Sequence, residues 1–381
     1  MATTHVFIVD EQTFPVHLKY MFAGIGKTDK DNNGNPVLNS SFDLQTCLNS
    51  KAYIGMIQDI SRIRIGDEIF FYVCKSQKGE GEFFGVFNVI QDSNEKIPFA
   101  FESNNSDESK SITRELNKTL QFRVKISHGT VYEKGVPEIQ LLDSFTTKTK
   151  AKDLCWSLIY RKLKGARGCT PITELESKKL KEELKRINES KVLELTDGCT
   201  LDFRNRKITI AEAITESPVL YHIDLESETG NILRNNISES VLQTYILSSD
   251  KILKRFINRN SEITWIGNEV FCSFGNSQID ILIVSKKDNT YVIYPIELKK
   301  EPLAPRDKDQ ILKYKSWCNI HKNSFVPAPV NVAKIKIVPI LITKQYTPNA
   351  RKTAIDNKEK ELKQNKIKHY IFDESLNITK I

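Results

Sequence analysis

The stretch "QIDILIVSKKDNTYVIYPIELKK", residues 278–300, decides how the second half of the chain should fold. It contains two apolar runs rich in β-branched and aromatic residues, separated by the polar turn "KKDNT", and this pattern predicts two neighbouring strands. Each run carries a carboxylate that an ordinary buried strand would lack, Asp280 in the first and Glu297 in the second. Because side chains alternate along a strand, Glu297 and Lys299 should point to the same side of the sheet.

A hairpin about this turn would bring Asp280 and Glu297 together, although they are seventeen residues apart. Two such carboxylates can hold a hard divalent cation, and we expect Mg²⁺, with Mn²⁺ as a substitute and no further cofactor. Lys299 could then touch an attacking water or a phosphate oxygen, where its charge would add to that of the metal. The residues therefore indicate metal-assisted hydrolysis of a phosphodiester.

The order of Asp280, Glu297 and Lys299 resembles the motif of the PD-(D/E)xK nuclease superfamily, with Ile279 where the motif has its proline. The resemblance covers roughly residues 230–375. Within the superfamily, this part of the chain is similar to RecB-type nucleases and archaeal mismatch endonucleases. It implies that Asp280 and Glu297 bind the metal. It also implies that Glu239, on a helix before the sheet, completes the metal site as a ligand or water contact.

The likeness continues after the lysine, where Gln310 and Tyr314 form a QxxxY pair one helical turn apart. The resemblance implies that this pair orients the active site and the phosphate backbone. It also matches Glu269 to an acidic residue beside a glycine turn, a role as plausible as a solvated side chain. The competing interpretation of the whole motif is an edge strand whose charged end enters solvent. The carboxylates that interrupt two apolar runs argue against that interpretation.

The chain divides into three parts by pattern, which predicts an α/β and α+β protein of several domains. Residues 1–147 are rich in predicted strands, such as "HVFIVD", "GDEIFFYV", "TLQFRVKI" and "PEIQLLD". Residues 148–200 have helical spacing and read as a connector of two helices, the second with Pro171 near its start. Residues 201–381 alternate helices and strands, which predicts a mixed sheet flanked by helices.

The first part resembles the PUA-like superfamily, and within it the EVE and YTH-type readers, through a "GDEIFFY" strand followed by a "FFGVFNV" strand. The resemblance implies a β-barrel-type domain that flips a modified base into an aromatic pocket. The candidate pocket walls are Tyr20, Phe22, Tyr53 and Trp156. For any single one of these rings, a place in the core is the better expectation, because aromatic side chains dominate core burial.

The composition narrows the class of protein. The 381 residues are 39% hydrophobic and 27% charged, with no membrane-length apolar window and no signal segment, so we expect a cytoplasmic protein without a membrane partner. Seven cysteines form no CxxC pair, and neither they nor the six histidines form a cluster of zinc spacing. The net charge of +8 permits a polyanionic partner without requiring one.

Together these patterns predict a metal-dependent endonuclease that acts on double-stranded DNA, with a base-reading domain in front of the nuclease domain. We expect a restriction-type enzyme, and leave open whether cutting depends on base modification. A homodimer is expected because duplex DNA is symmetric. The alternatives are a nuclease selective for mismatches or other structures, and a nucleic-acid reader whose nuclease fold is silent.

Overall fold

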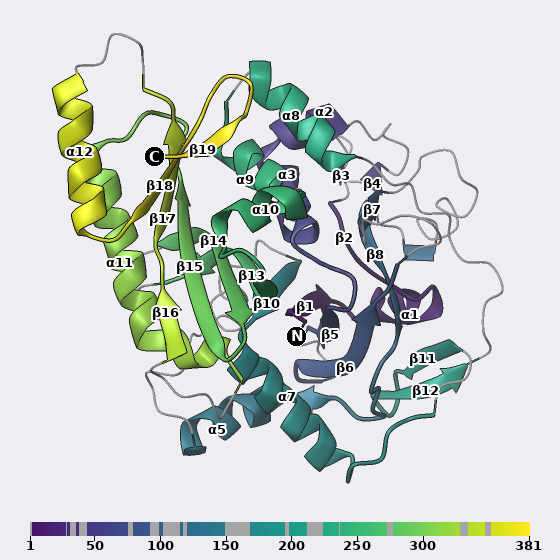
Figure 1. Ribbon diagram of the computed structural model, residues 1–381. Helices are drawn as coiled ribbons and strands as arrows, with labels where there is room; N and C mark the ends of the chain where they lie inside the picture. Colours follow the sequence, from purple (N-terminus) through teal and green to yellow (C-terminus); the bar gives the residue numbers. More distant parts are fainter. Residues whose placement is uncertain are drawn as a thin grey trace. The chain divides into compact units, whose positions relative to one another are not determined.

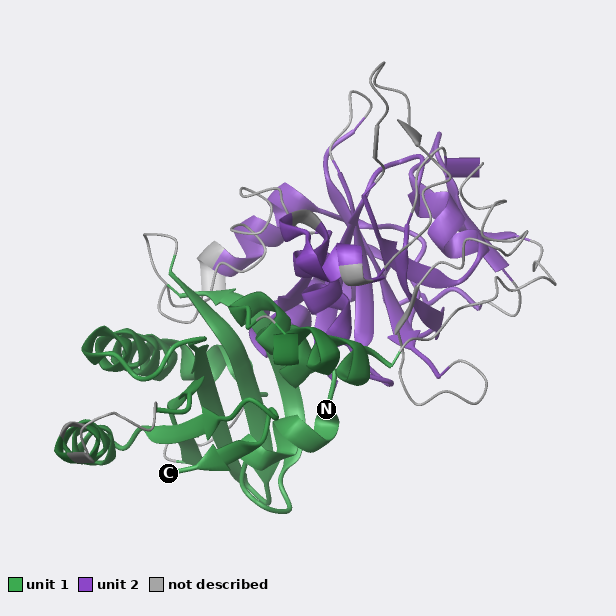
Figure 2. Cartoon of the chain, turned by 90° about the horizontal axis from the view of Figure 1, so that it is seen from above, with its two compact units in different colours: residues 1, 152–157, 224–381 green, residues 2–151, 158–223 purple. Residues whose placement is uncertain are grey.

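The computed structural model describes residues 2–27, 29–30, 36–37, 44–74, 79–91, 99–101, 115–116, 120–148, 168–194, 198–211, 224–235, 237–272, 277–327, 334–346 and 352–381 (Figure 1). The chain forms two compact units of mixed α/β structure (Figure 2). Unit 2 holds residues 2–151 and 158–223, whereas unit 1 holds residues 1, 152–157 and 224–381. The expectation of a mixed α/β chain with more than one domain is therefore confirmed.

Unit 2 contains most of the strands of the first half of the chain. Its described strands are β1 (Thr4–Val9), β2 (Phe22–Ile25), β3 (Asp29–Lys30), β4 (Pro36–Val37), β5 (Glu68–Val73), β6 (Glu82–Val89), β7 (Phe99–Phe101), β8 (Phe122–His128), β9 (Val136–Pro137), β10 (Cys169–Ile172), β11 (Gly198–Asp202) and β12 (Lys207–Ala211). Its described helices are α1 (Phe14–Lys19), α2 (Leu44–Asn49), α3 (Lys51–Ser61), α5 (Glu138–Lys148) and α7 (Glu174–Ile187).

The main sheet of unit 2 has the strand order β10-β1-β5-β6-β8-β2, and β7 and β9 pair beside it. β1 and β5 are parallel, and the other described strand pairs of this sheet are antiparallel. Aromatic rings fill the core of this unit. Phe14 lies 5.2 Å from Phe71 and 5.3 Å from Phe84, measured between ring centroids. These contacts agree with the run of aromatic residues in the two predicted central strands.

The structure corrects two sequence-based boundaries in unit 2. The segment "PEIQLLD", expected as a strand, forms only the short β9 and then enters α5. Leu141 and Phe145, four residues apart, are both buried, so the apolar pattern has the period of a helix. Pro171 lies in β10 rather than in a helix, because α7 begins at Glu174 behind a capping box made by Thr173.

The described residues of the predicted connector, residues 148–200, belong to unit 2 and form no compact unit of their own. β10 pairs with β1 in the main sheet of unit 2, and α7 belongs to the same unit. The first of its two expected helices, in residues 151–165, lies outside the described residues. The boundary expected at residue 201 also differs, because β11 and β12 belong to unit 2 and unit 1 resumes at Asp224.

Unit 1 follows the predicted alternation of helices and strands. Its described elements are α8 (Leu225–Asn235), α9 (Glu239–Leu247), α10 (Asp250–Phe256), β13 (Glu262–Phe271), β14 (Gln278–Lys287), β15 (Thr290–Leu298), α11 (Pro305–His321), the 3₁₀ helix η2 (Lys322–Phe325), β16 (Ile335–Ile337), β17 (Ile340–Lys344), α12 (Lys352–Gln364), β18 (Lys368–Phe372) and β19 (Ile378–Lys380).

The sheet of unit 1 is mixed and has the strand order β13-β14-β15-β17-β18-β19, with β16 beside β15. β13, β14 and β15 are antiparallel, whereas β17 and β18 continue from β15 in parallel. One side chain of α11 in each turn, among them Ile311, Tyr314 and Cys318, packs into a core with Ile293 and Leu341 of the sheet. This packing fixes α11 beside β14 and β15.

No helix in the described ranges is both long enough and apolar enough to span a membrane.

Candidate active site

The candidate site lies on the β14–β15 hairpin, where the two interrupting carboxylates meet. Ile281 of β14 pairs with Ile296 of β15, so Asp280 and Glu297 occupy the next positions on adjacent strands. A tight turn sets this register, with Lys287 opposite Thr290 and Asp288 in the left-handed region at φ 52°. Asp tolerates that conformation better than most residues, which explains its place in the turn. The predicted hairpin is therefore present.

Asp280 is held by the backbone of the partner strand. The amide of Leu298 donates a hydrogen bond to its Oδ2 at 2.7 Å. Burial raises the pKa of Asp280 well above its usual value, and the negative charge of Glu297 raises it further. A positive charge near the carboxylates would offset both effects, so the site favours cations.

Glu297 is 1% exposed, which is exceptional for a glutamate. Its Oε1 accepts a hydrogen bond from the ammonium of Lys299, so the two side chains lie on one side of the strand as expected. Burial raises the pKa of Glu297, although the bond to Lys299 opposes this shift. Within the described residues its buried Oε2 makes no hydrogen bond of good geometry, although the nearby Tyr314 hydroxyl also lowers the pKa of Glu297. That oxygen is available to a further cation.

Lys299 is a charged donor rather than a base. Desolvation lowers its pKa, but the hydrogen bond and charge of Glu297 outweigh desolvation, and the pKa is raised overall. Asp280 and Glu239 add to the same effect. The side chain is therefore an ammonium at neutral pH, suited to stabilising negative charge.

Glu239 is the first residue of α9 and approaches the end of β15. Its Oε1 accepts a hydrogen bond from the amide of Lys300 at 3.2 Å, and its charge raises the pKa of both Asp280 and Glu297. One turn later on α9, Gln243 donates to the backbone carbonyl of Asp280. Gln243 is a residue of the candidate site that the motif does not include, but its position four residues after Glu239 places it on the same helix face and could have indicated it.

Gln310 and Tyr314 lie on the same face of α11, as expected from their spacing of four residues. Gln310 Nε2 donates to the Tyr314 hydroxyl at 2.8 Å, and that hydroxyl donates to the carbonyl of Gln278 at 2.6 Å. The pKa of Tyr314 is raised, first by burial and then by the charge of Glu297. The pair therefore fixes the start of β14, two residues before Asp280.

The donor set suits a hard divalent cation. Asp280 and Glu297 are neighbouring oxygen donors with raised pKa values, and Glu297 has a buried oxygen free among the described contacts. In the described part of the chain, no group of three His, Cys, Asp or Glu side chains is placed to hold a metal ion, so Glu239 does not complete a ready three-ligand set. Mg²⁺ is commonly bound by one or two carboxylates and several waters.

Glu269 lies inside β13 rather than in a turn. Its neighbours Asn268 and Val270 pair with Ile281 and Ile279, so it falls opposite Asp280, with φ at 45°. Cys272 of the same region is buried, and its thiol donates to the carbonyl of Ser277 at 3.3 Å. Burial and the charge of Glu297 raise the pKa of this thiol to about 12, so it stays protonated.

The proposed base-reading rings occupy different environments. Phe22 is 1% exposed and stacks near His17 at 4.6 Å, so it belongs to the core rather than to an open pocket wall. Tyr20 and Tyr53 are half-buried, and their hydroxyls donate to Glu115 Oε2 at 3.2 Å and to the Lys27 carbonyl at 3.4 Å. Trp156 lies outside the described residues.

Comparison with known proteins gives weak likenesses only. No family model and no curated protein matches the chain. A hypothetical protein from Leishmania major is 9% identical over 50% of this chain and 96% of its own, with a TM-score of 0.28. Human THYN1 in complex with DNA containing 5-methylcytosine is 14% identical over 46% of this chain and 94% of its own, with a TM-score of 0.25.

The MspJI restriction endonuclease in complex with a 27-mer oligonucleotide is similar over more of the chain. It is 10% identical over 97% of this chain and 74% of its own, with a TM-score of 0.23. Scores of this size carry no conclusion about activity, which must come from the residues of the site.

Proposed function

We propose that this protein is a divalent-metal-dependent endonuclease that hydrolyses phosphodiester bonds in double-stranded DNA. The observation that supports this function best is the meeting of Asp280, Glu297 and Lys299 at one end of a buried hairpin. Two carboxylates with raised pKa values are costly to a fold, and an intact set of this kind is expected where a cation is used. A silent nuclease fold would not need to keep all three.

The residues of the site have separate roles in this proposal. Asp280 and Glu297 would hold Mg²⁺, which supplies a Lewis acid and lowers the pKa of a nearby water. Glu239 would contact waters at the edge of the site. Lys299, as an ammonium, would donate to a phosphoryl oxygen or orient the attacking water. Gln310 and Tyr314 are positioning residues, because they act on the backbone that carries Asp280.

We further propose that unit 2 selects the DNA through a base-reading pocket, with Tyr20 and Tyr53 as the half-buried candidates for its walls. The PUA-like resemblance of residues 1–147 supports this role, and a modified base is the preferred target. One carboxylate site per chain cuts one strand, so we propose a homodimer for cutting both strands. Nuclease selectivity for mismatches and a purely binding role are the competing outcomes of the test below.

Cleavage of two matched plasmids tests the proposal. One plasmid is unmodified and the other carries methylated or hydroxymethylated cytosine, and each is incubated with the protein and Mg²⁺, Mn²⁺ or EDTA. We expect cutting with either metal and none with EDTA. Lys299→Ala should lower the rate about 10²- to 10³-fold, the usual cost of removing one charge-stabilising donor. Lys287→Ala, which removes an exposed lysine at the far end of the same hairpin, is the matched control.

The pattern of cutting separates the alternatives. Cutting of the modified plasmid alone would support both the nuclease and the reader. Equal cutting of both plasmids would keep the nuclease and remove the modification reader. If wild-type protein cuts neither plasmid but cuts mismatched duplexes, structure-selective cutting replaces the proposal. No cutting of any DNA with either metal would rule out the nuclease.

A further inference from the structure

Unit 1 has a second charged feature, a hollow of about 640 Å³ whose lining residues lie on or beside α12, β16, β18 and β19. It is lined by Lys336, Lys363, Lys366, Lys368 and Lys380. The hollow is separate from the carboxylate site. Lys336 pairs beside Val292 of β15, five residues before Glu297, which corresponds to about 16 Å along the strand.

The lysine hollow carries an excess of positive charge within the described chain, although Lys363 also attracts the Glu359 carboxylate of the same helix. Its lining includes the α-carboxylate-bearing Ile381 but no Asp or Glu side chain, and none of its five ammonium groups forms an ion pair with a described Asp or Glu. Lys368 is half-buried, and its Nζ lies 5.4 Å from the centroid of the Tyr294 ring. Burial lowers the pKa of Lys368, and the charge of Lys380 lowers it further. An anion bound here would relieve this repulsion.

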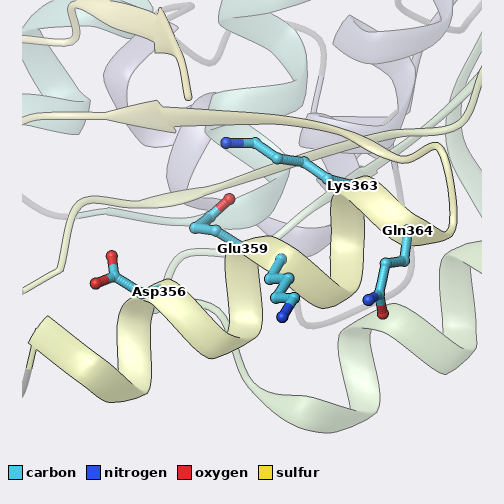
Figure 3. Close-up of a pocket in the computed structure, with 5 residues that line it drawn as sticks. Asp356, Glu359, Lys363 and Gln364 are labelled. Atoms are coloured by element: carbon cyan, nitrogen blue, oxygen red, sulfur yellow. The ribbon is translucent and has the colours of Figure 1, made fainter.

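A neighbouring hollow on α12 shows the contrast (Figure 3). It has a volume of about 470 Å³ and is lined by Asp356, Glu359, Lys360, Lys363 and Gln364. Lysines and carboxylates are mixed there, and Glu359 already accepts hydrogen bonds within 3.0 Å from His369 and Tyr346. A polyanion has no electrostatic reason to enter this second hollow, but it has one to enter the lysine hollow.

We propose that the lysine hollow binds the phosphate backbone of double-stranded DNA at a place separate from the bond that is cut. Lysine ammonium groups are flexible point charges that suit phosphates and carry little information about base edges. The rest of the hollow is lined by apolar side chains that can pack against sugar groups, those of Ile337, Val338, Ile367 and Ile381. The choice of DNA rests on the proposed function, whereas the preference for a phosphate-bearing polyanion rests on the charges alone.

The test measures duplex binding without added metal, so that the DNA stays intact, over a range of salt concentrations. The variant Lys336→Gln/Lys366→Gln/Lys380→Gln removes three exposed lysines of the hollow. We expect it to reduce the slope of log affinity against log salt by about 3 and to weaken binding roughly 10²-fold at 0.1 M salt. The control is Lys251→Gln/Lys254→Gln/Lys313→Gln, which removes the same charge from exposed positions on α10 and α11.

The outcomes distinguish this proposal from the proposed function. If the wild type binds duplex and the hollow variant keeps its salt slope, or if the control loses as much affinity, the lysine hollow is not the backbone site, but the nuclease proposal stands. If the wild type binds no duplex at all without metal, the proposal for the lysine hollow fails, and the cleavage assay with metal decides the nuclease proposal separately. A titration of the wild type and of the hollow variant with tripolyphosphate tests whether the site binds small polyanions instead of DNA. Loss of tripolyphosphate binding in the hollow variant with unchanged duplex binding would make this a site for small polyanions and overturn the DNA proposal.

Discussion

At the scale of single residues, the burial of Asp280 beside Glu297 lowers the stability of the fold whenever the Asp280 carboxyl group is charged. Its pKa is raised in the folded chain by burial and by Glu297, so the folded state holds its proton more tightly than the unfolded state does. The contribution of Asp280 to the free energy of unfolding is therefore greatest below its pKa in the unfolded chain, about 3.9. This contribution is lost as the pH rises through the pKa of Asp280 in the folded chain.

Asp280→Asn should therefore stabilise the metal-free protein at neutral pH, since the amide removes the charge and can still accept from the Leu298 amide. We expect a rise in Tm of a few degrees, because about 1 kcal/mol shifts the Tm of a domain of this size by about 2–4 °C. The gain should shrink as the pH falls towards 4. Thermal melts in EDTA across this pH range measure it.

The same melts include Asp288→Asn, an exposed carboxylate in the hairpin turn, as the control. Mg²⁺ should raise the Tm of the wild type and of this control, but not that of Asp280→Asn. A lower Tm for Asp280→Asn at neutral pH would show that the carboxylate is compensated without metal, contrary to this account.

At the scale of secondary-structure elements, α11 is tied to β14 by Tyr314. Tyr314→Phe removes the donor to the Gln278 carbonyl and the acceptor of the Gln310 amide, so both lose a partner. We expect a loss of about 1 kcal/mol in unfolding free energy and a fall in cleavage rate of roughly tenfold, with duplex affinity unchanged. Denaturant melts, single-turnover cleavage and binding titrations separate these effects.

Tyr245→Phe on α9 is the control for this substitution, because it removes a half-buried phenol from another helix of unit 1. A loss of duplex affinity in Tyr314→Phe equal to its loss of rate would assign Tyr314 to DNA contact instead of to the positioning of β14.

The elements near the site were predictable because their patterns are strong and local. The alternating and apolar runs of β14 and β15 and the helical spacing of α11 place five of the six site residues without tertiary information. Where the pattern was ambiguous, tertiary pairing decided. The run "KIKIVPILIT", residues 334–343, has the apolar pattern of a single strand, but it divides into β16 and β17 at Val338 and Pro339, and both pieces pair with β15.

Other features could not be predicted from spacing. Phe22 lies in β2, which pairs with β8, a contact between residues about a hundred positions apart, and its side chain is buried. The assignment of β10 to unit 2 depends in the same way on its pairing with β1. Nothing in the helical spacing of residues 148–200 signals that pairing.

At the scale of the whole molecule, the division into two units predicts that ligands act on separate parts of the chain. Mg²⁺ should slow backbone hydrogen exchange in β14 and β15 and leave β1, β5 and β6 unchanged, since the candidate carboxylates all lie in unit 1. Exchange mass spectrometry with and without Mg²⁺ measures this. Equal slowing in both units would show that the cation acts elsewhere or on the whole fold.

The bond between Lys299 and Glu297 has one further consequence. A divalent cation bound at the other oxygen, Oε2, would place a second positive charge beside the Lys299 ammonium on the same carboxylate, so the two charges would repel each other. Cation binding would therefore weaken the hydrogen bond between Lys299 and Glu297. It would also lower the pKa of Lys299, because a neighbouring like charge disfavours the charged form of a lysine.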